Sequence, residues 1–246
     1  MKVRLRFTKT GKVRFTSHRD VARMWERALR RADLPVAYSE GFSPRPKLSF
    51  GLALSTGHES LAEYLDVEFS EQQETNGVES IDVTDLPGHL SPLLPIGIDV
   101  VSAAEIESGT PSLQESVTSC QWRIEALGFD VERAEQLVAV ALNCDELLVT
   151  RIRKGREVTD DLRPAIHSIS VLGPTEEGVQ LEAELLVHPR SVRPSELLSA
   201  VFPSGVEEGR VWRLAQWIWS DGAHVEPLPL AGLPDATASP HDMVRA

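Results

Sequence analysis

The sequence predicts an α+β protein with two tandem ferredoxin-like domains and a flexible C-terminal tail. Its 246 residues are enough for two ordinary domains. Apolar residues alternate with polar ones in some segments, as in half-buried strands, and recur with helical spacing in others. In each half the elements approximate strand–helix–strand–strand–helix–strand, which is the split βαβ plan. We therefore place domains at 1–104 and 117–222, a linker at 105–116 and a disordered tail at 223–246.

The N-terminal half begins with a strand, because charged and apolar residues alternate cleanly over residues 2–8. Val13 and Phe15 continue that alternation after a short turn. A helix begins at about Ser17, because Ser17 and Asp20 fit a capping box. The other elements expected in this half are a loop at 41–47, strands at 48–54 and 62–69, a helix at 80–90 and a strand at 96–103.

The second half follows a polar linker that contains Gly and Pro and lacks any periodicity. Its expected elements are a strand at 117–127, a helix at 131–142, strands at 146–153, 165–172 and 179–187, a helix at 194–201 and a strand at 211–219. Asp160 and Asp161 follow a basic run and are interpreted as part of a charged, solvated turn. Four prolines mark the segment after about Ala223 as a loose tail.

The charges are distributed very unevenly along the chain. The whole protein has a net charge of −12, yet residues 1–50 contain thirteen Lys or Arg and four Asp or Glu, which gives +9. Residues 48–122 contain no Lys or Arg. An acidic protein with one strongly basic end attracts a polyanion at that end and repels it elsewhere. This asymmetry predicts a nucleic-acid partner.

The cysteines and histidines exclude several kinds of site. Cys120 and Cys144 are the only cysteines, which is too few for a Cys-ligated iron–sulfur cluster or a structural zinc site. The histidines show no metal-binding spacing, and there is no phosphate-binding glycine loop. We therefore expect this chain to bind no metal and no cofactor. No apolar run reaches the ~20 residues of a membrane span, and the start lacks a secretory signal, so a cytoplasmic location is expected.

Three clusters near the N-terminus are candidate RNA or phosphate contacts. The first cluster is the set of basic groups on the first strand and turn. The second is the helix, whose start has free N–H groups and whose arginine stripe also includes Arg27 and Arg30. The third is a loop stiffened by prolines, which presents Phe42 for stacking on a base. A further basic cluster lies in the second half. The candidate residues are Arg4, Arg6, Lys12, Arg14, Ser17, His18, Arg19, Arg23, Gly41, Phe42, Ser43, Arg45, Lys47, Arg151, Arg153 and Lys154.

Two long motifs resemble the radical SAM-linked protein family of unknown function. They are the segment from Phe15 to Asp20, which leads into the helix, and the stretch from Gly41 to Ser60. Apart from this N-terminal match, the stretch from Thr150 to Ile166 looks like the family's second conserved region. The resemblance implies a stand-alone form of a domain that also occurs fused behind radical SAM domains. It implies a radical SAM enzyme as partner, with S-adenosylmethionine and an iron–sulfur cluster only on that partner, and a role in RNA modification.

The leading hypothesis is therefore a non-catalytic accessory protein that binds RNA or presents a substrate to a radical SAM enzyme. One alternative is a metal-independent endoribonuclease, similar in fold to CRISPR repeat-processing enzymes, in which His18 acts with Lys12 or Lys47 as acid or base. A second alternative is a protein–protein adaptor whose basic face docks an acidic partner without RNA.

Overall fold

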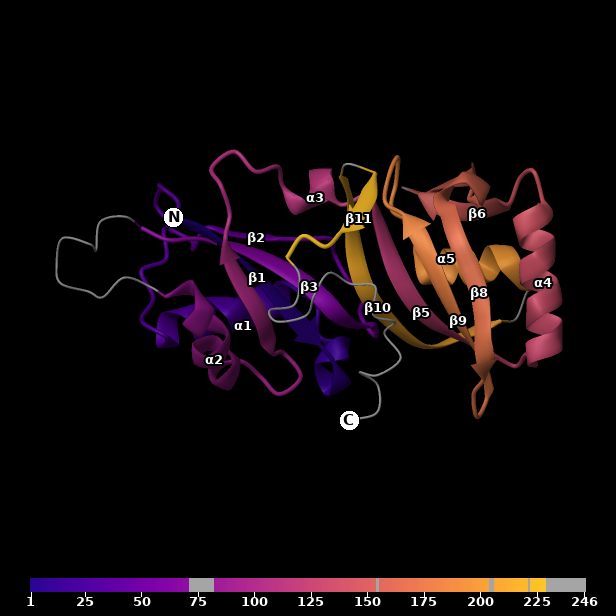
Figure 1. The fold of residues 1–246 in the computed structure, drawn as a ribbon, viewed down its shortest axis with the longest axis horizontal. Helices are drawn as coiled ribbons and strands as arrows, with labels where there is room; N and C mark the ends of the chain where they lie inside the picture. Colours follow the sequence, from indigo (N-terminus) through magenta and orange to yellow (C-terminus); the bar gives the residue numbers. More distant parts are fainter. Residues whose placement is uncertain (71–81, 154, 204–205, 221, 229–246) are drawn as a thin grey trace. The chain divides into compact units, whose positions relative to one another are not determined.

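The computed structural model describes residues 1–70, 82–153, 155–203, 206–220 and 222–228. It is a mixed α+β structure, so the α+β part of the predicted fold class is confirmed. The chain divides into two compact units (Figure 1). Unit 1 comprises Met1–Ser116 together with Trp219–Ala246, and unit 2 comprises Val117–Ile218. None of the described helices is long and apolar enough to cross a membrane.

Unit 1 is an antiparallel sheet with helices packed on one face. The sheet order is β4-β1-β3-β2, and every neighbouring pair is antiparallel. The elements of unit 1 are β1 (Lys2–Lys9), η1 (Gly11–Phe15), α1 (His18–Arg31), β2 (Leu48–Phe50), β3 (Glu59–Glu68), η3 (Val83–Asp85), α2 (Leu86–Leu90), η4 (Ser91–Leu93), β4 (Val100–Glu105), α3 (Leu113–Ser116) and β11 (Ala223–Val225).

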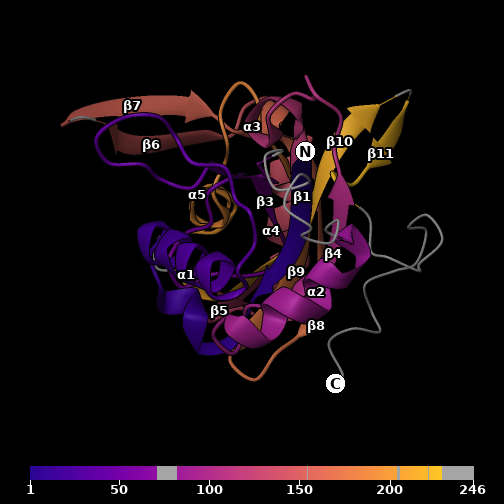
Figure 2. The same cartoon turned by 90° about the vertical axis from the view of Figure 1, so that its left-hand side faces the viewer.

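Helices α1 and α2 cover the apolar face of this sheet (Figure 2). The odd-numbered residues of β1, Val3, Leu5 and Phe7, enter the same core as the buried side of α1. The Phe7 and Trp25 rings meet edge to face with centroids 5.0 Å apart. The alternation of β1 and the helical period of α1 thus converge on one core, as strand and helix geometry require.

Unit 2 has the same sheet order with one insertion. The order is β10-β5-β9-β8, again with antiparallel pairs, and a separate β6–β7 hairpin lies between α4 and β8 in the chain. The elements are β5 (Ser119–Leu127), α4 (Val131–Asn143), β6 (Leu148–Arg153), β7 (Arg156–Asp161), η5 (Arg163–Ala165), β8 (Ile166–Pro174), β9 (Gly178–Leu186), α5 (Pro194–Val201) and β10 (Glu207–Ser220), whose last two residues belong to unit 1.

Several local expectations differ from the structure. Val13 and Phe15 lie in a 3-10 helix and do not extend the first strand. Asp160 and Asp161 belong to β7, not to a turn, because they pair across the hairpin with Val149 and Leu148. The helix expected at 80–90 begins outside the described residues and is a 3-10 turn followed by the short α2. The predicted strand at 48–54 ends after three residues.

The other face of the unit 1 sheet is charged, and it is also buried. Arg4 of β1 is 2% exposed and donates two hydrogen bonds to Asp66 of β3, at 2.7 and 3.0 Å. Lys2 contacts the same carboxylate at 3.3 Å. Arg6, two residues along β1, pairs with Glu226, which lies in the segment that the sequence assigns to the tail. Arg4 and Arg6 of the first strand are therefore each paired with a carboxylate inside unit 1.

We predict that Asp66→Ala strongly destabilises the protein. The substitution leaves the buried Arg4 guanidinium without its carboxylate, which typically costs about 3–5 kcal/mol. Glu68→Ala is the matched control, because its ion pair with Lys47 leaves both side chains nearly half exposed and is worth less than about 1 kcal/mol. Urea unfolding measures both losses of free energy. Equal, small losses would show that the buried pair does not hold the sheet together.

Candidate nucleic-acid interface

The solvent side of α1 has a row of arginines. One side of the helix is buried and carries Val21, Trp25, Ala28 and Leu29. The helical period places the arginines on the other side, which is exposed. The exposed arginines of α1 are Arg19, Arg23, Arg27, Arg30 and Arg31.

Most of this row is not tied up in ion pairs among the described residues. Arg23 contacts Asp20 at 3.3 Å. Within the described part of the chain, the other four arginines form no ion pair. The row extends from Arg19 to Arg31, about 18 Å at 1.5 Å per residue. We refer to these five side chains as the α1 arginine row.

Ser17 caps the first turn of α1 as the sequence predicts, but the Asp20 carboxylate of the predicted capping box bonds to the Ser17 hydroxyl. Ser17 is the N-cap, and its hydroxyl oxygen accepts a hydrogen bond from the Asp20 amide at 3.2 Å. The same hydroxyl donates to the Asp20 carboxylate at 2.7 Å. This hydrogen bond holds the pKa of Asp20 below its ordinary value, with help from the Arg23 guanidinium. Ser17 is thus occupied with helix capping, although it remains exposed.

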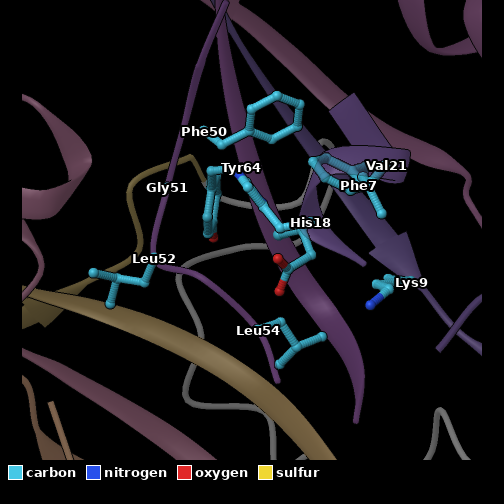
Figure 3. A pocket seen from close by; sticks show the side chains of 10 residues that line it. Phe7, Lys9, His18, Val21, Phe50, Gly51, Leu52, Leu54 and Tyr64 are labelled. Atoms are coloured by element: carbon cyan, nitrogen blue, oxygen red, sulfur yellow. The ribbon is translucent and has the colours of Figure 1, made fainter. Parts of the chain in front are cut away.

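His18 lies beside a small pocket at this end of the helix (Figure 3). Its ring meets Phe50 edge to face at 5.1 Å. Lys9 and Glu63 also line the pocket, so an imidazole, an ammonium group and a carboxylate contribute to its lining. The space between the side chains accommodates little more than a water molecule. The pocket can therefore accept a small polar group but not a nucleobase.

The loop at 39–47 is closed by hydrogen bonds at its base and exposed at its tip. The Ser39 amide donates to the Arg45 carbonyl at 2.8 Å, and the Arg45 amide donates to the Ser39 hydroxyl at 3.1 Å. Gly41 has a φ of +125°, which side chains rarely adopt. The Phe42 ring is fully exposed, and Ser43 and the Arg45 side chain are exposed as well. An aromatic ring and a cation are thus presented on a constrained loop.

The remaining N-terminal candidates occupy different environments. Lys12 is exposed, whereas Arg14 is partly covered, contacts Glu59 at 3.7 Å and lies over the Phe15 ring at 4.6 Å. Lys47 pairs with Glu68 at 3.0 Å. Arg4 and Arg6 lie in the buried pairs described above. The structure therefore separates the candidates into free surface cations and internally paired ones.

The second basic cluster belongs to unit 2 and is tied to acidic neighbours. Arg151 of β6 contacts Asp160 at 2.8 Å and Glu196 at 3.8 Å. Arg190 contacts the same two carboxylates at 3.2 and 2.9 Å. Lys154 lies outside the described residues, and for Arg153 only the backbone pairing with Arg156 is described. Arg151 thus joins the hairpin to α5 through a charge network.

Sequence reasoning missed Arg31 and left Arg27 and Arg30 out of the candidate list. The helical period places all three on the solvent side, and only the structure shows that they form no ion pair with the described residues. No group of three or more metal-ligating side chains occurs among the described residues.

Together these features define a two-unit α+β protein with an exposed cationic helix and an aromatic-tipped loop. The chain belongs to a family described as an uncharacterized protein conserved in bacteria (DUF2344), whose model matches residues 2–194. No curated protein matches the chain.

Proposed function

We propose that the protein is a non-catalytic accessory protein that binds single-stranded RNA on unit 1. The observation that carries the proposal is the α1 arginine row, in which four exposed guanidinium groups form no ion pair among the described residues. Arginine forms charge-assisted, bidentate hydrogen bonds with phosphate. A row of such groups along a helix follows a phosphate backbone without reading its sequence.

The loop at 39–47 supports RNA over an acidic protein partner. Phosphate contacts alone suit any polyanion, but the fully exposed Phe42 ring, on the same loop as Arg45, also offers a stacking surface for a base. Single-stranded nucleic acid exposes both phosphates and base faces, and it therefore uses both features of unit 1. The protein–protein adaptor uses only the charges, and the tests below separate the two.

The radical SAM partner remains part of the proposal on the strength of the sequence resemblance. The accessory protein would hold the RNA, and the partner would carry S-adenosylmethionine and the iron–sulfur cluster. We also propose that each unit is a ferredoxin-like domain, because each has the strand order 4-1-3-2 of the split βαβ plan when its four sheet strands are numbered in sequence.

The first test removes two members of the α1 arginine row. For Arg19→Ala with Arg27→Ala we expect weaker binding of single-stranded RNA. The slope of log K against log salt should flatten by about 1.4, because each phosphate contact on a single strand contributes about 0.7. Fluorescence anisotropy across a salt series measures both quantities.

The control is Arg133→Ala with Arg193→Ala, which removes the same charge from exposed positions of unit 2. It should leave the slope close to that of the wild type. If the salt slope flattens equally in the control and in the α1 variant, the binding is due to net charge and α1 is not the site.

Phe42→Ala tests the stacking contact separately. We expect a loss of about 1–3 kcal/mol in RNA affinity, the usual value of one stacked base. The salt slope should not change, because no cation is removed. The adaptor alternative predicts instead that Phe42→Ala leaves RNA affinity unaffected. The same anisotropy titrations decide, with Phe15→Ala as a control for loss of another exposed aromatic ring.

One observation favours the endoribonuclease as a second candidate. His18, Lys9 and Glu63 line the same pocket, and an imidazole, a cation and a carboxylate are the kinds of group that acid–base cleavage uses. In the structure, Lys9 and Glu63 line the pocket with His18. The sequence hypothesis had instead paired His18 with Lys12 or Lys47.

Under the accessory-protein proposal, the wild type does not cleave RNA in the presence of EDTA. His18→Ala should lower RNA affinity modestly and change no chemistry. Gel analysis of labelled RNA after prolonged incubation provides the measurement. Cleavage that the wild type performs and His18→Ala abolishes would establish the endoribonuclease and refute the non-catalytic role.

A further inference from the structure

Tyr38 lies opposite Pro46 in an isolated antiparallel bridge at the base of the loop at 39–47. Two backbone hydrogen bonds of 2.8 Å flank the bridge, so Tyr38 and Pro46 themselves form a non-hydrogen-bonded pair. In such a pair the two side chains lie close together. Proline suits this position, because no amide donor is required there. The backbone of Tyr38 is therefore held by the hydrogen bonds on either side of it.

The Tyr38 side chain is open to solvent. It is 46% exposed, and its hydroxyl group forms no hydrogen bond with the described residues. The other tyrosine of the chain, Tyr64, is 1% exposed and belongs to the interior of unit 1. A tyrosine ring on a fixed backbone offers a large contact area and loses little conformational entropy when a ligand covers it. Tyr38 thus has the properties of a binding residue, whereas Tyr64 has those of a core residue.

The Tyr38 side chain lies on the side of the sheet that carries α1. Val36, two residues earlier, bridges Phe69, and both belong to the core that α1 covers. Residues two apart on an extended segment point to the same side. Tyr38 is therefore on the helix-covered side, beyond the C-terminal end of α1, where Arg30 and Arg31 are exposed.

The next residue along the ladder supports this assignment, because it lies on the opposite side. Lys47 follows Pro46 and pairs with Glu68 at 3.0 Å. Glu68 is two residues from Asp66 on β3, so it shares the charged face of the sheet. Lys47 thus belongs to the charged face, and Tyr38 shares its side of the sheet with the α1 arginine row.

We propose that Tyr38 is a second base-stacking position of the RNA site and that it acts together with the α1 arginine row. The row binds phosphates on the helix-covered side, and a base of the same strand stacks on the Tyr38 ring. Phe42, at the tip of the loop, takes a different base. A duplex keeps its base faces stacked inside and uses neither ring. This inference rests on the proposed function and narrows its ligand to strands with unstacked bases.

Tyr38→Val is the test of the stacking contact. Valine is a good strand former, so the bridge to Pro46 is kept while the aromatic ring is lost. We expect the affinity for oligouridine to fall at least about fivefold, the lower end of what one stacked base contributes. The salt slope should stay the same, because no charge is removed. Fluorescence anisotropy with labelled oligouridine measures both, and affinity for duplex RNA of the same length should not change.

Two control variants separate stacking from other causes. Tyr38→Phe keeps the ring and should bind oligouridine like the wild type. Phe15→Ala removes a ring that is 63% exposed at another place in unit 1, and it should also bind like the wild type. A fall of the same size in Phe15→Ala would show that any exposed ring contributes, and it would overturn the assignment to Tyr38.

Nitration by tetranitromethane reports on the ring directly. In the free protein Tyr38 should react and the buried Tyr64 should not, as located by mass spectrometry, and saturating oligouridine should protect Tyr38. Unprotected Tyr38 in the saturated complex, or equal oligouridine affinity in the wild type and Tyr38→Val, overturns this inference and leaves the RNA proposal standing. A wild type that binds no RNA overturns both.

Discussion

A guanidinium buried in a sheet must have a carboxylate beside it, and this constraint organises unit 1. Transfer of an unpaired charge into the protein interior costs several kcal/mol. Arg4 lies between β3 and β4 on the central strand and is 2% exposed, so β3 must supply Asp66 directly opposite. The pairing aligns β1 with β3, which places the apolar residues of both strands on the helix-covered face. The charged face and the core are therefore specified by one register.

The same constraint determines which cations remain available to a ligand. The segment 48–122 contains no Lys or Arg and supplies carboxylates to the basic N-terminal residues. Glu59 contacts Arg14, Asp66 contacts Lys2 and Arg4, and Glu68 contacts Lys47. None of these pairs involves α1. The excess positive charge of the first fifty residues therefore lies mostly on the solvent side of α1, where the helical period separates it from the core.

Local sequence patterns predicted the elements whose determinants are close together in the chain. The Ser17–Asp20 cap, the extent of α1 and the alternation of β1 depend on residues within a few positions of each other, and the structure shows all three. Patterns could not predict the burial of Arg4 and Arg6, because their partners are 62 and 220 residues away. β7 was missed for a similar reason. Its charged residues resemble a turn, and they form a strand through pairing with β6.

The acidic remainder of the protein complements the exposed row on α1. The residues after position 50 carry twelve basic and thirty-three acidic side chains, so most of the chain repels a polyanion. Exposed charges more than about 10 Å apart are largely screened at moderate ionic strength, so binding depends on cations that lie close together. The α1 arginine row meets that requirement, and the network around Arg151 does not, because Asp160 and Glu196 lie among its cations. Some arginines are buried in ion pairs and others are exposed on α1. An acidic chain thus presents a single cationic helix among its described residues.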